Sequence, residues 1–138
     1  MPKLEQLQST AEPEDVFELL QRDGAVVVEN ILEPEKLRQL NQELDNLIAT
    51  TAPGLRHPAA ERMVDFYGLS TVRIDGLPGK SETFVEVMAS PLLCAAADHF
   101  LLPHCHDYIF NTGQLIQIGP GESPQRLHRD EDAWSFLK

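Results

Sequence analysis

The sequence predicts an α+β fold in which helices pack outside a β-sandwich whose strands have only begun. Apolar residues at helical spacing dominate the first hundred positions, whereas alternating, β-rich segments follow Pro103. Helices followed by strands are typical of α+β proteins and argue against a doubly wound parallel sheet. The chain has 138 residues, enough for one domain and too few for two ordinary ones, so residues 1–138 are expected to form a single domain.

The first half of the chain predicts two helices and one strand. Residues 1–12 have no apolar period and are expected to be a loose lead-in. A helix follows over residues 12–22 and stops at Gly24, because glycine tolerates the positive φ that closes a helix. The β-branched run over residues 25–32 predicts a strand. A second helix opens at Pro34 and runs to Thr50. One face of it carries Leu37, Leu40, Leu44, Leu47 and Ile48.

The second half predicts a long loop, a split helix and several extended segments. Residues 51–62 contain two prolines and a glycine and have no period, which is typical of a loop. Residues 66–77 favour an extended segment with a turn at 76–79. Ser81 is an expected N-cap, and Pro91 should divide the following helix in two. Residues 106–120 alternate as a strand does, and residues 125–134 indicate the start of another strand.

Charge and composition exclude two classes of partner. The formal net charge is −11, from 22 acidic and 11 basic residues, without a basic stripe, so no nucleic-acid partner is expected. No apolar run approaches the roughly 20 residues of a membrane span, and the N-terminus does not resemble a secretory signal. Cys94 and Cys105 are therefore expected to be reduced, mostly buried thiols in a cytoplasmic protein.

His128, Arg129 and Asp130 form the pattern that carries the most chemistry. On a strand, side chains two residues apart point to the same face, with Cα atoms about 6.5–7 Å apart. An imidazole nitrogen and a carboxylate oxygen can then bind one metal while Arg129 points away. A second histidine from a distant strand would complete the facial triad of non-heme Fe(II) oxygenases. Taken alone, these three residues favour a surface strand with solvated charges over a metal site.

A second group, His104-Cys105-His106-Asp107, could be read as a soft metal site. It is isolated and has no second half, so a loop leading into the strand expected from Tyr108 is the favoured interpretation. Gly119-Pro120-Gly121 lacks the lysine and the following helix of a phosphate-binding loop.

Three segments together resemble a known family in their order and spacing. They are DGAVVVENILEPEKLRQLNQELD, TVRIDGLPGKSETFVEVMASPLL and YIFNTGQLIQIGPGESPQRLHRDEDAW. Together they resemble the N-terminal portion of the phytanoyl-CoA dioxygenase-like family, from about Val16 onward. The likeness is greater to its bacterial and fungal secondary-metabolite branch than to its peroxisomal lipid enzymes. The resemblance implies a double-stranded β-helix (jelly roll) whose major sheet is supported by helices.

The resemblance assigns four residues to a site. His128 and Asp130 match the first two iron ligands. Gln125 matches a glutamine that contacts 2-oxoglutarate, and Arg73 lies where the fungal branch has an arginine near this co-substrate. A cationic fork facing a carboxylate is chemically sensible there. The alternatives are an ordinary turn residue for Gln125 and a surface salt bridge for Arg73. Competitors for these positions are Arg56 and the Glu131-Asp132 pair.

The resemblance also implies the reaction and its cofactors. Fe(II), 2-oxoglutarate and dioxygen would act together, yielding succinate and carbon dioxide and oxidising a C–H bond of a small organic, secondary-metabolite or lipid-like substrate. The family's third iron ligand, a histidine, and the arginine that binds 2-oxoglutarate are expected beyond Lys138, so this chain is expected to be an N-terminal fragment of the oxygenase domain.

Two other functions stay open. The first is a catalytically silent half-domain that acts as a binding module and self-associates through an open sheet edge. The second is an enzyme of the same fold that uses another metal or no cofactor.

Overall fold

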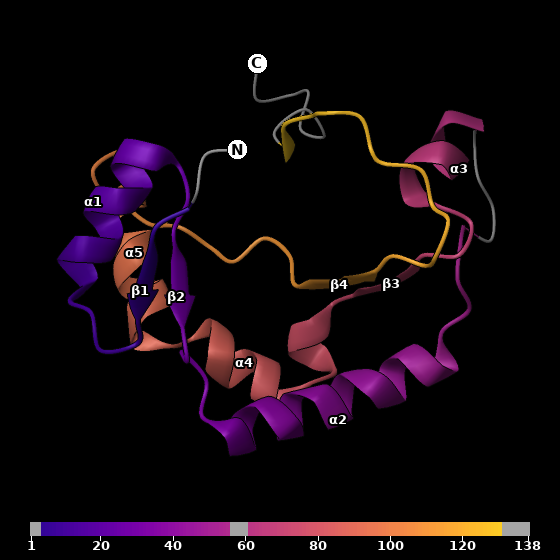
Figure 1. Ribbon diagram of the computed structural model, residues 1–138, viewed down its shortest axis with the longest axis horizontal. Helices are drawn as coiled ribbons and strands as arrows, with labels where there is room; N and C mark the ends of the chain where they lie inside the picture. The colour runs from indigo at the N-terminus through magenta and orange to yellow at the C-terminus, as the bar shows by residue number, and fades with distance from the viewer. Residues whose placement is uncertain (1–3, 56–60, 131–138) are drawn as a thin grey trace.

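The computed structural model describes residues 4–55 and 61–130. Its helices and strands form two groups, and the chain passes between them from β2 to α2, from α4 to α5 and from α5 to β4 (Figure 1). One group holds α1, α5 and the β1–β2 pair, and the other holds α2, α3, α4 and the β3–β4 pair. Within the described residues the fold is mixed helix and strand, as predicted, and contains two two-stranded sheets but no closed barrel.

The first group is a small unit of strand, helix and strand. Strand β1 (Gln6–Gln8) pairs in parallel with β2 (Val27–Glu29), and α1 (Pro13–Asp23) connects them. The prediction of a loose lead-in over residues 1–12 is therefore wrong for residues 6–8, and residues 1–3 lie outside the described part. Strand β1 is only three residues long and has one apolar side chain, so periodicity alone could not detect it. Within the predicted strand over residues 25–32, only the three residues of β2 form a strand.

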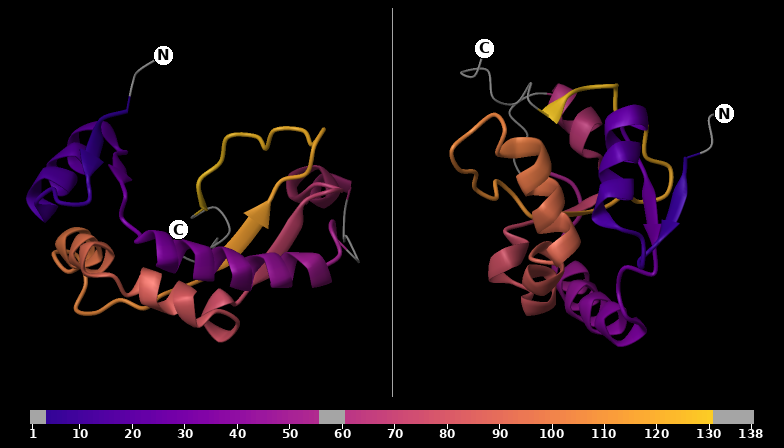
Figure 2. Two further views of the ribbon diagram at one scale, coloured as in Figure 1. Left: turned by 60° about the horizontal axis from the view of Figure 1, so that its bottom comes forward. Right: turned by 90° about the vertical axis from the view of Figure 1, so that its left-hand side faces the viewer.

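Helix α1 begins and ends within one residue of the prediction, and α5 (Pro91–Leu101) covers its apolar face. Gly24 closes α1 with a φ of 76°, and its N–H donates to the carbonyl of Leu20 at 2.9 Å. Phe17 is buried, and its ring stacks on that of His99 with centroids 4.5 Å apart. Helices α1 and α5 lie side by side in both figures (Figure 2).

The second group contains the main core. Strand β3 (Val72–Asp75) pairs antiparallel with β4 (Gln114–Gln117), and α2 (Pro34–Thr50) packs against β3. The buried core is formed by Val72, Ile74 and Leu77, the last of which lies on the 3-10 turn η1 (Leu77–Gly79). The partly buried residues packed against this core are Leu44, Leu47, Ile48, Phe84 and Leu115. The C-terminal half of the predicted apolar face of α2 thus contacts the core, whereas Leu37 is exposed.

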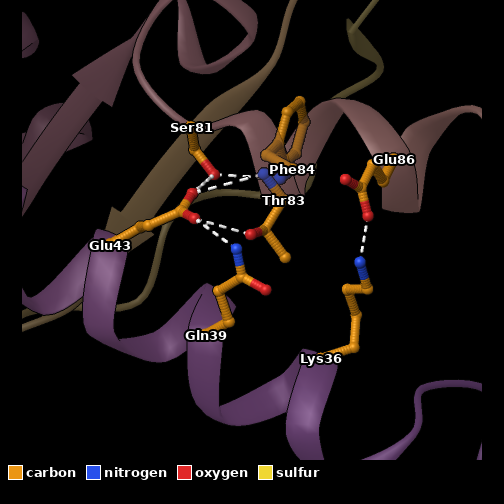
Figure 3. A network of polar contacts seen from close by, with 7 residues as sticks. All are labelled: Lys36, Gln39, Glu43, Ser81, Thr83, Phe84 and Glu86. Atoms are coloured by element: carbon orange, nitrogen blue, oxygen red, sulfur yellow. Dashed lines mark hydrogen bonds and ion pairs between the residues drawn. The ribbon is translucent and has the colours of Figure 1, made fainter.

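Helix α4 (Glu82–Met88) is capped twice, once by its own Ser81 and once by α2 (Figure 3). The Ser81 hydroxyl accepts from the N–H of Phe84 at 2.9 Å, as the sequence predicted. The carboxylate of Glu43 accepts from the Ser81 hydroxyl at 2.5 Å and from the Thr83 hydroxyl at 2.6 Å. These bonds join α2 to α4. Pro91 separates α4 from α5, again as predicted.

Helix α3 (Glu61–Tyr67) contradicts two predictions. It covers the end of the expected loop 51–62 and the start of the extended segment 66–77; residues 56–60 lie outside the described part. Its half-buried residues are Met63, Val64, Phe66 and Tyr67, which lie on one helical face. Gly68 then ends the helix with a φ of 81°. The stretch is short, so its period was hidden between the proline-rich loop and β3.

Three further predictions are wrong in whole or in part. Within the described residues, the expected strand over 106–120 is reduced to β4, and residues 125–130 form no strand because no second strand pairs with them. Cys94 and Cys105 are both exposed rather than buried. Cys94 is exposed because helix α5, on which it lies, packs against few other elements, and no residue of α5 is buried.

Within the described residues, no single helix is long and apolar enough to cross a membrane. Helices α4 and α5 reach that length and composition only together, with a 50° bend between them.

Candidate metal and co-substrate site

His128 and Asp130 lie close together although they are not on a strand. After β4 the chain passes α3 and returns over the β3–β4 pair (Figure 1). In this irregular segment, His128 Nε2 lies 3.5 Å from Asp130 Oδ1. The His128 side chain is 31% exposed, and that of Asp130 is fully exposed. The two-residue spacing therefore brings a nitrogen and an oxygen donor together, by a different backbone route from the one predicted.

The hydrogen bonding of His128 favours metal binding through Nε2. Its Nδ1 lies 2.9 Å from the carbonyl oxygen of Arg126. A carbonyl only accepts, so Nδ1 carries the hydrogen and the lone pair of the neutral ring is left on Nε2. Metal-binding histidines commonly donate their other ring N–H to a backbone carbonyl in this way.

The spacing of the two donor atoms also fits a metal ion. Two ligands at right angles, each about 2.1 Å from a metal, lie about 3 Å apart. The observed 3.5 Å requires only a small rotation of the exposed Asp130 side chain. Within the described residues, no group of three or more His, Cys, Asp or Glu side chains could hold a metal. The described residues thus bring together two side chains that could each offer one donor atom to a metal.

Helix α3 forms one wall beside this pair. The Phe66 ring meets the His128 ring edge to face, with centroids 5.1 Å apart and planes at 69°. The side-chain amide of Gln125 donates to the main-chain carbonyl of Phe66 at 2.8 Å. Phe66 therefore contacts the segment that carries Gln125 and His128 at two points.

Arg73 lies on β3 beside the same helix. Its guanidinium carbon is 4.7 Å from the centroid of the Tyr67 ring, a cation–π contact. Its nitrogens also donate to the Tyr67 carbonyl at 3.4 Å and to the Gln114 side chain at 3.5 Å. Within the part of the chain that the structure describes, Arg73 forms no salt bridge. Its charge is therefore not neutralised by a carboxylate there.

Arg73 and Gln125 line the same pocket, which has a volume of about 400 Å³. Phe66 and Tyr67 form part of its wall, and Ile116 and Ile118 add apolar surface. A larger hollow of about 820 Å³ shares the stretch from Asp65 to Tyr67 and the stretch from Glu122 to Gln125 with it. The structure thus places the two predicted co-substrate residues around one cavity next to the His128 segment.

Glu122 connects the segment after β4, which also carries His128, to Ser70 and Thr71. The sequence did not indicate this contact. Its carboxylate accepts from the N–H of Ser70, from the Ser70 hydroxyl at 2.9 Å and from the Thr71 hydroxyl at 3.4 Å. The bond from the Ser70 backbone is the first cause that lowers the pKa of Glu122, and the Ser70 hydroxyl adds to it. No local pattern announces such a contact, because its partners lie 51 and 52 residues away.

The other residues considered from the sequence do not join the site. His104, Cys105 and His106 are exposed in the turn and coil after α5, as the loop interpretation expected. His99 packs on Phe17 in the other group of elements. Arg56, Glu131 and Asp132 lie outside the described residues.

Comparison with known proteins identifies the family. The family described as Phytanoyl-CoA dioxygenase (PhyH) matches residues 20–137, and the chain belongs to this family. This confirms the resemblance found in the sequence.

Similar curated proteins carry the name dioxygenase and come from fungi. The chain is 32% identical over 120 residues to Dioxygenase aneA of Aspergillus aculeatus, covering 86% of this chain and 40% of that protein. It is 31% identical over 135 residues to Dioxygenase FUM3 of Gibberella moniliformis, covering 93% and 44%. It is 28% identical over 130 residues to Dioxygenase trt7 of Aspergillus terreus, covering 94% and 44%. The chain thus spans less than half the length of these relatives.

Proposed function

We propose that this chain is the N-terminal part of an Fe(II)- and 2-oxoglutarate-dependent dioxygenase in which His128 and Asp130 are two of the metal ligands. The observation that carries the proposal is the geometry of the pair. The Nδ1–H of His128 is held by the Arg126 carbonyl, and Nε2 is 3.5 Å from a carboxylate oxygen. Membership of the phytanoyl-CoA dioxygenase family and the names of the fungal relatives support it.

The third ligand is proposed to be a histidine on a segment outside residues 1–138. The relatives are more than twice as long as the part that this chain matches, which leaves room for such a segment. The same segment would supply the remaining strands of a jelly roll. Strands β3 and β4 would then belong to its sheets, with α2 covering them from outside.

The pocket next to the pair is proposed to bind 2-oxoglutarate. Arg73 offers a cation that no described carboxylate neutralises, and a co-substrate carboxylate would complement it. The amide nitrogen of Gln125 has two hydrogens and gives one to the Phe66 carbonyl, so the second can donate to a co-substrate oxygen. The adjoining hollow of about 820 Å³ has the volume of typical small-molecule sites and would take the organic substrate.

In this proposal the residues of the chain bind the metal and orient the co-substrate. Fe(II), when bound together with 2-oxoglutarate, supplies the chemistry that activates dioxygen for oxidation of a C–H bond. His128 and Asp130 hold the metal on one side, and the Arg126 carbonyl keeps the His128 proton on Nδ1. Arg73 and Gln125 orient the co-substrate. The side chains of Phe66, Ile116 and Ile118 give the pocket an apolar wall.

The test is 2-oxoglutarate turnover by the complete protein, with succinate formation and oxygen uptake measured together. The expected result is equal amounts of succinate formed and oxygen consumed, with loss of both in His128→Ala and in Asp130→Ala. His106→Ala is the matched control, because His106 is an exposed histidine outside the site, and it should retain turnover. An active protein that is indifferent to His128→Ala would refute the ligand assignment. Absence of turnover in a folded, complete protein would instead favour a silent binding module.

A further inference from the structure

A row of ring contacts connects the candidate metal ligand to the candidate co-substrate arginine. The His128 ring meets the Phe66 ring at 5.1 Å, and the Phe66 ring meets the Tyr67 ring at 5.5 Å with planes at 68°. The Tyr67 ring in turn lies under the guanidinium of Arg73 at 4.7 Å. We call these four side chains the aromatic row. Its two middle members, Phe66 and Tyr67, are neighbours at the end of α3.

The segment that carries His128 needs such a support. Within the described residues, the stretch from 123 to 129 belongs to no helix or strand, so no backbone ladder fixes the direction of its side chains. The bond from Nδ1 to the Arg126 carbonyl is local, since it spans only two residues, and does not tie the ring to the rest of the fold. Only longer-range contacts can do so, and the Phe66 ring and the bond from Gln125 to the Phe66 carbonyl are two of them.

The end of α3 is itself fixed to the sheet. Its last turn is followed by Gly68, whose backbone passes so close to Glu122 and Thr71 that an added Cβ would lie 2.5 Å from the Thr71 hydroxyl and 2.8 Å from the Glu122 carboxylate. Arg73 on β3 also donates to the Tyr67 carbonyl. The strand that carries Arg73 thus holds Tyr67, whose ring contacts the Phe66 ring, and Phe66 in turn contacts His128.

We propose that Phe66 is a positioning residue whose ring fixes the orientation of the His128 imidazole relative to Arg73. The inference rests on the proposed function, because it assigns a role to Phe66 only if His128 binds the metal. An imidazole that is already oriented loses less conformational freedom when a metal binds, so removing the ring should weaken metal binding while leaving both ligands in place.

The experiment uses Phe66→Leu in the complete protein, which removes the aromatic ring and keeps an apolar side chain and the main-chain carbonyl. Phe66→Tyr restores a ring and is the rescue variant. Phe110→Leu is the matched control, because Phe110 is half exposed and its ring contact is with Phe84, away from the site. The readouts are the affinity for Fe(II) alone, titrated without oxygen, and the His128 ring-proton resonances of the metal-free protein.

We expect Phe66→Leu to weaken Fe(II) binding about three- to tenfold, the size of an edge-to-face ring contact, and to shift the His128 ring protons. Phe66→Tyr should restore both values, and Phe110→Leu should change neither. In the unsubstituted protein, a nuclear Overhauser contact between the Phe66 and His128 rings is expected whether or not the leucine variant folds.

Absence of that Overhauser contact, or an Fe(II) affinity of Phe66→Leu equal to that of Phe110→Leu, would overturn the inference. His128→Ala, included in the same titration, separates the two proposals. If His128→Ala also leaves Fe(II) affinity unchanged, the proposed function fails. If it abolishes binding while Phe66→Leu has no effect, only the positioning role fails.

Discussion

Gly119→Ala should loosen the attachment of the ligand-bearing segment to the sheet. Gly119 lies two residues after the end of β4, and extending the β3–β4 register by two residues places it opposite Ser70. A Cβ added there would lie 2.4 Å from the Ser70 carbonyl oxygen and 2.8 Å from the Ser70 Cβ. Because the first of these is a backbone atom, no change of rotamer can relieve the contact. The two strands would have to separate locally by most of an ångström.

The expected change in the free energy of unfolding of Gly119→Ala follows from two opposing effects. Forcing extra volume into a packed position typically costs about 1–3 kcal/mol. Replacing glycine by alanine also removes freedom from the unfolded chain, which stabilises the folded state by about 0.4–1 kcal/mol. The net expectation is a loss of about 1–2 kcal/mol for Gly119→Ala. Gly79→Ala is the matched control, since its added Cβ meets nothing within 4 Å and its φ is not positive, so only the stabilising effect remains.

The assay is urea unfolding of both variants and the unsubstituted protein, with free energies from linear extrapolation. Gly119→Ala should be the less stable variant by about 1–3 kcal/mol relative to Gly79→Ala, because the effect on the unfolded chain is common to both and only the packing cost differs. Equal stability of the two variants would refute the reasoning, because it would mean that Gly119 and Ser70 are not in close contact.

Two further predictions concern pH. The Ser81 hydroxyl, followed by Thr83, lowers the pKa of Glu43 from its ordinary value of 4.5. A lowered folded-state pKa stabilises the fold above the unfolded value, and the effect is lost as the pH falls through the folded value. The difference in Tm between the unsubstituted protein and Glu43→Gln should therefore be largest at neutral pH and shrink below about pH 4.5; a difference that is constant with pH would contradict this. Tyr108 donates to Asp98 at 2.5 Å, and this bond is the main cause that raises the pKa of Tyr108 to about 12. Asp98→Asn should bring it back toward 10.0 in an absorbance titration of the phenol, and an unchanged titration would show that the bond is absent.

The helices could be predicted where the signals are local. Pro34, Ser81 and Pro91 mark helix starts through their own backbone and capping chemistry, and Gly24 marks an end in the same way. The short elements could not be predicted. Strand β1 and helix α3 form because of neighbours that lie about 20 to 60 residues away, and neither has enough residues to show a period. The strand expected at 125–134 is wrong for its described part, residues 125–130, because no described strand pairs with them.

Some residues of the candidate site could likewise be predicted from the sequence, and others could not. The proximity of His128 and Asp130 could be predicted from their spacing, because two side chains so close in sequence can converge on several backbone paths. The placement of Gln125 and Arg73 around one pocket agrees with the family resemblance, while their contact with a co-substrate stays a prediction. Phe66 and Glu122 could not be predicted, because what marks them is a set of contacts between segments distant in the sequence.

The most direct test of the proposal that His128 and Asp130 bind the metal is a structure of the complete protein loaded with Fe(II) in the absence of oxygen. If the proposed ligands are correct, one metal ion will be bound by His128 Nε2 and by an Asp130 carboxylate oxygen, each at about 2.1 Å, and Nδ1 will still donate to the Arg126 carbonyl. A metal bound elsewhere, or bound to His128 through Nδ1, would contradict it.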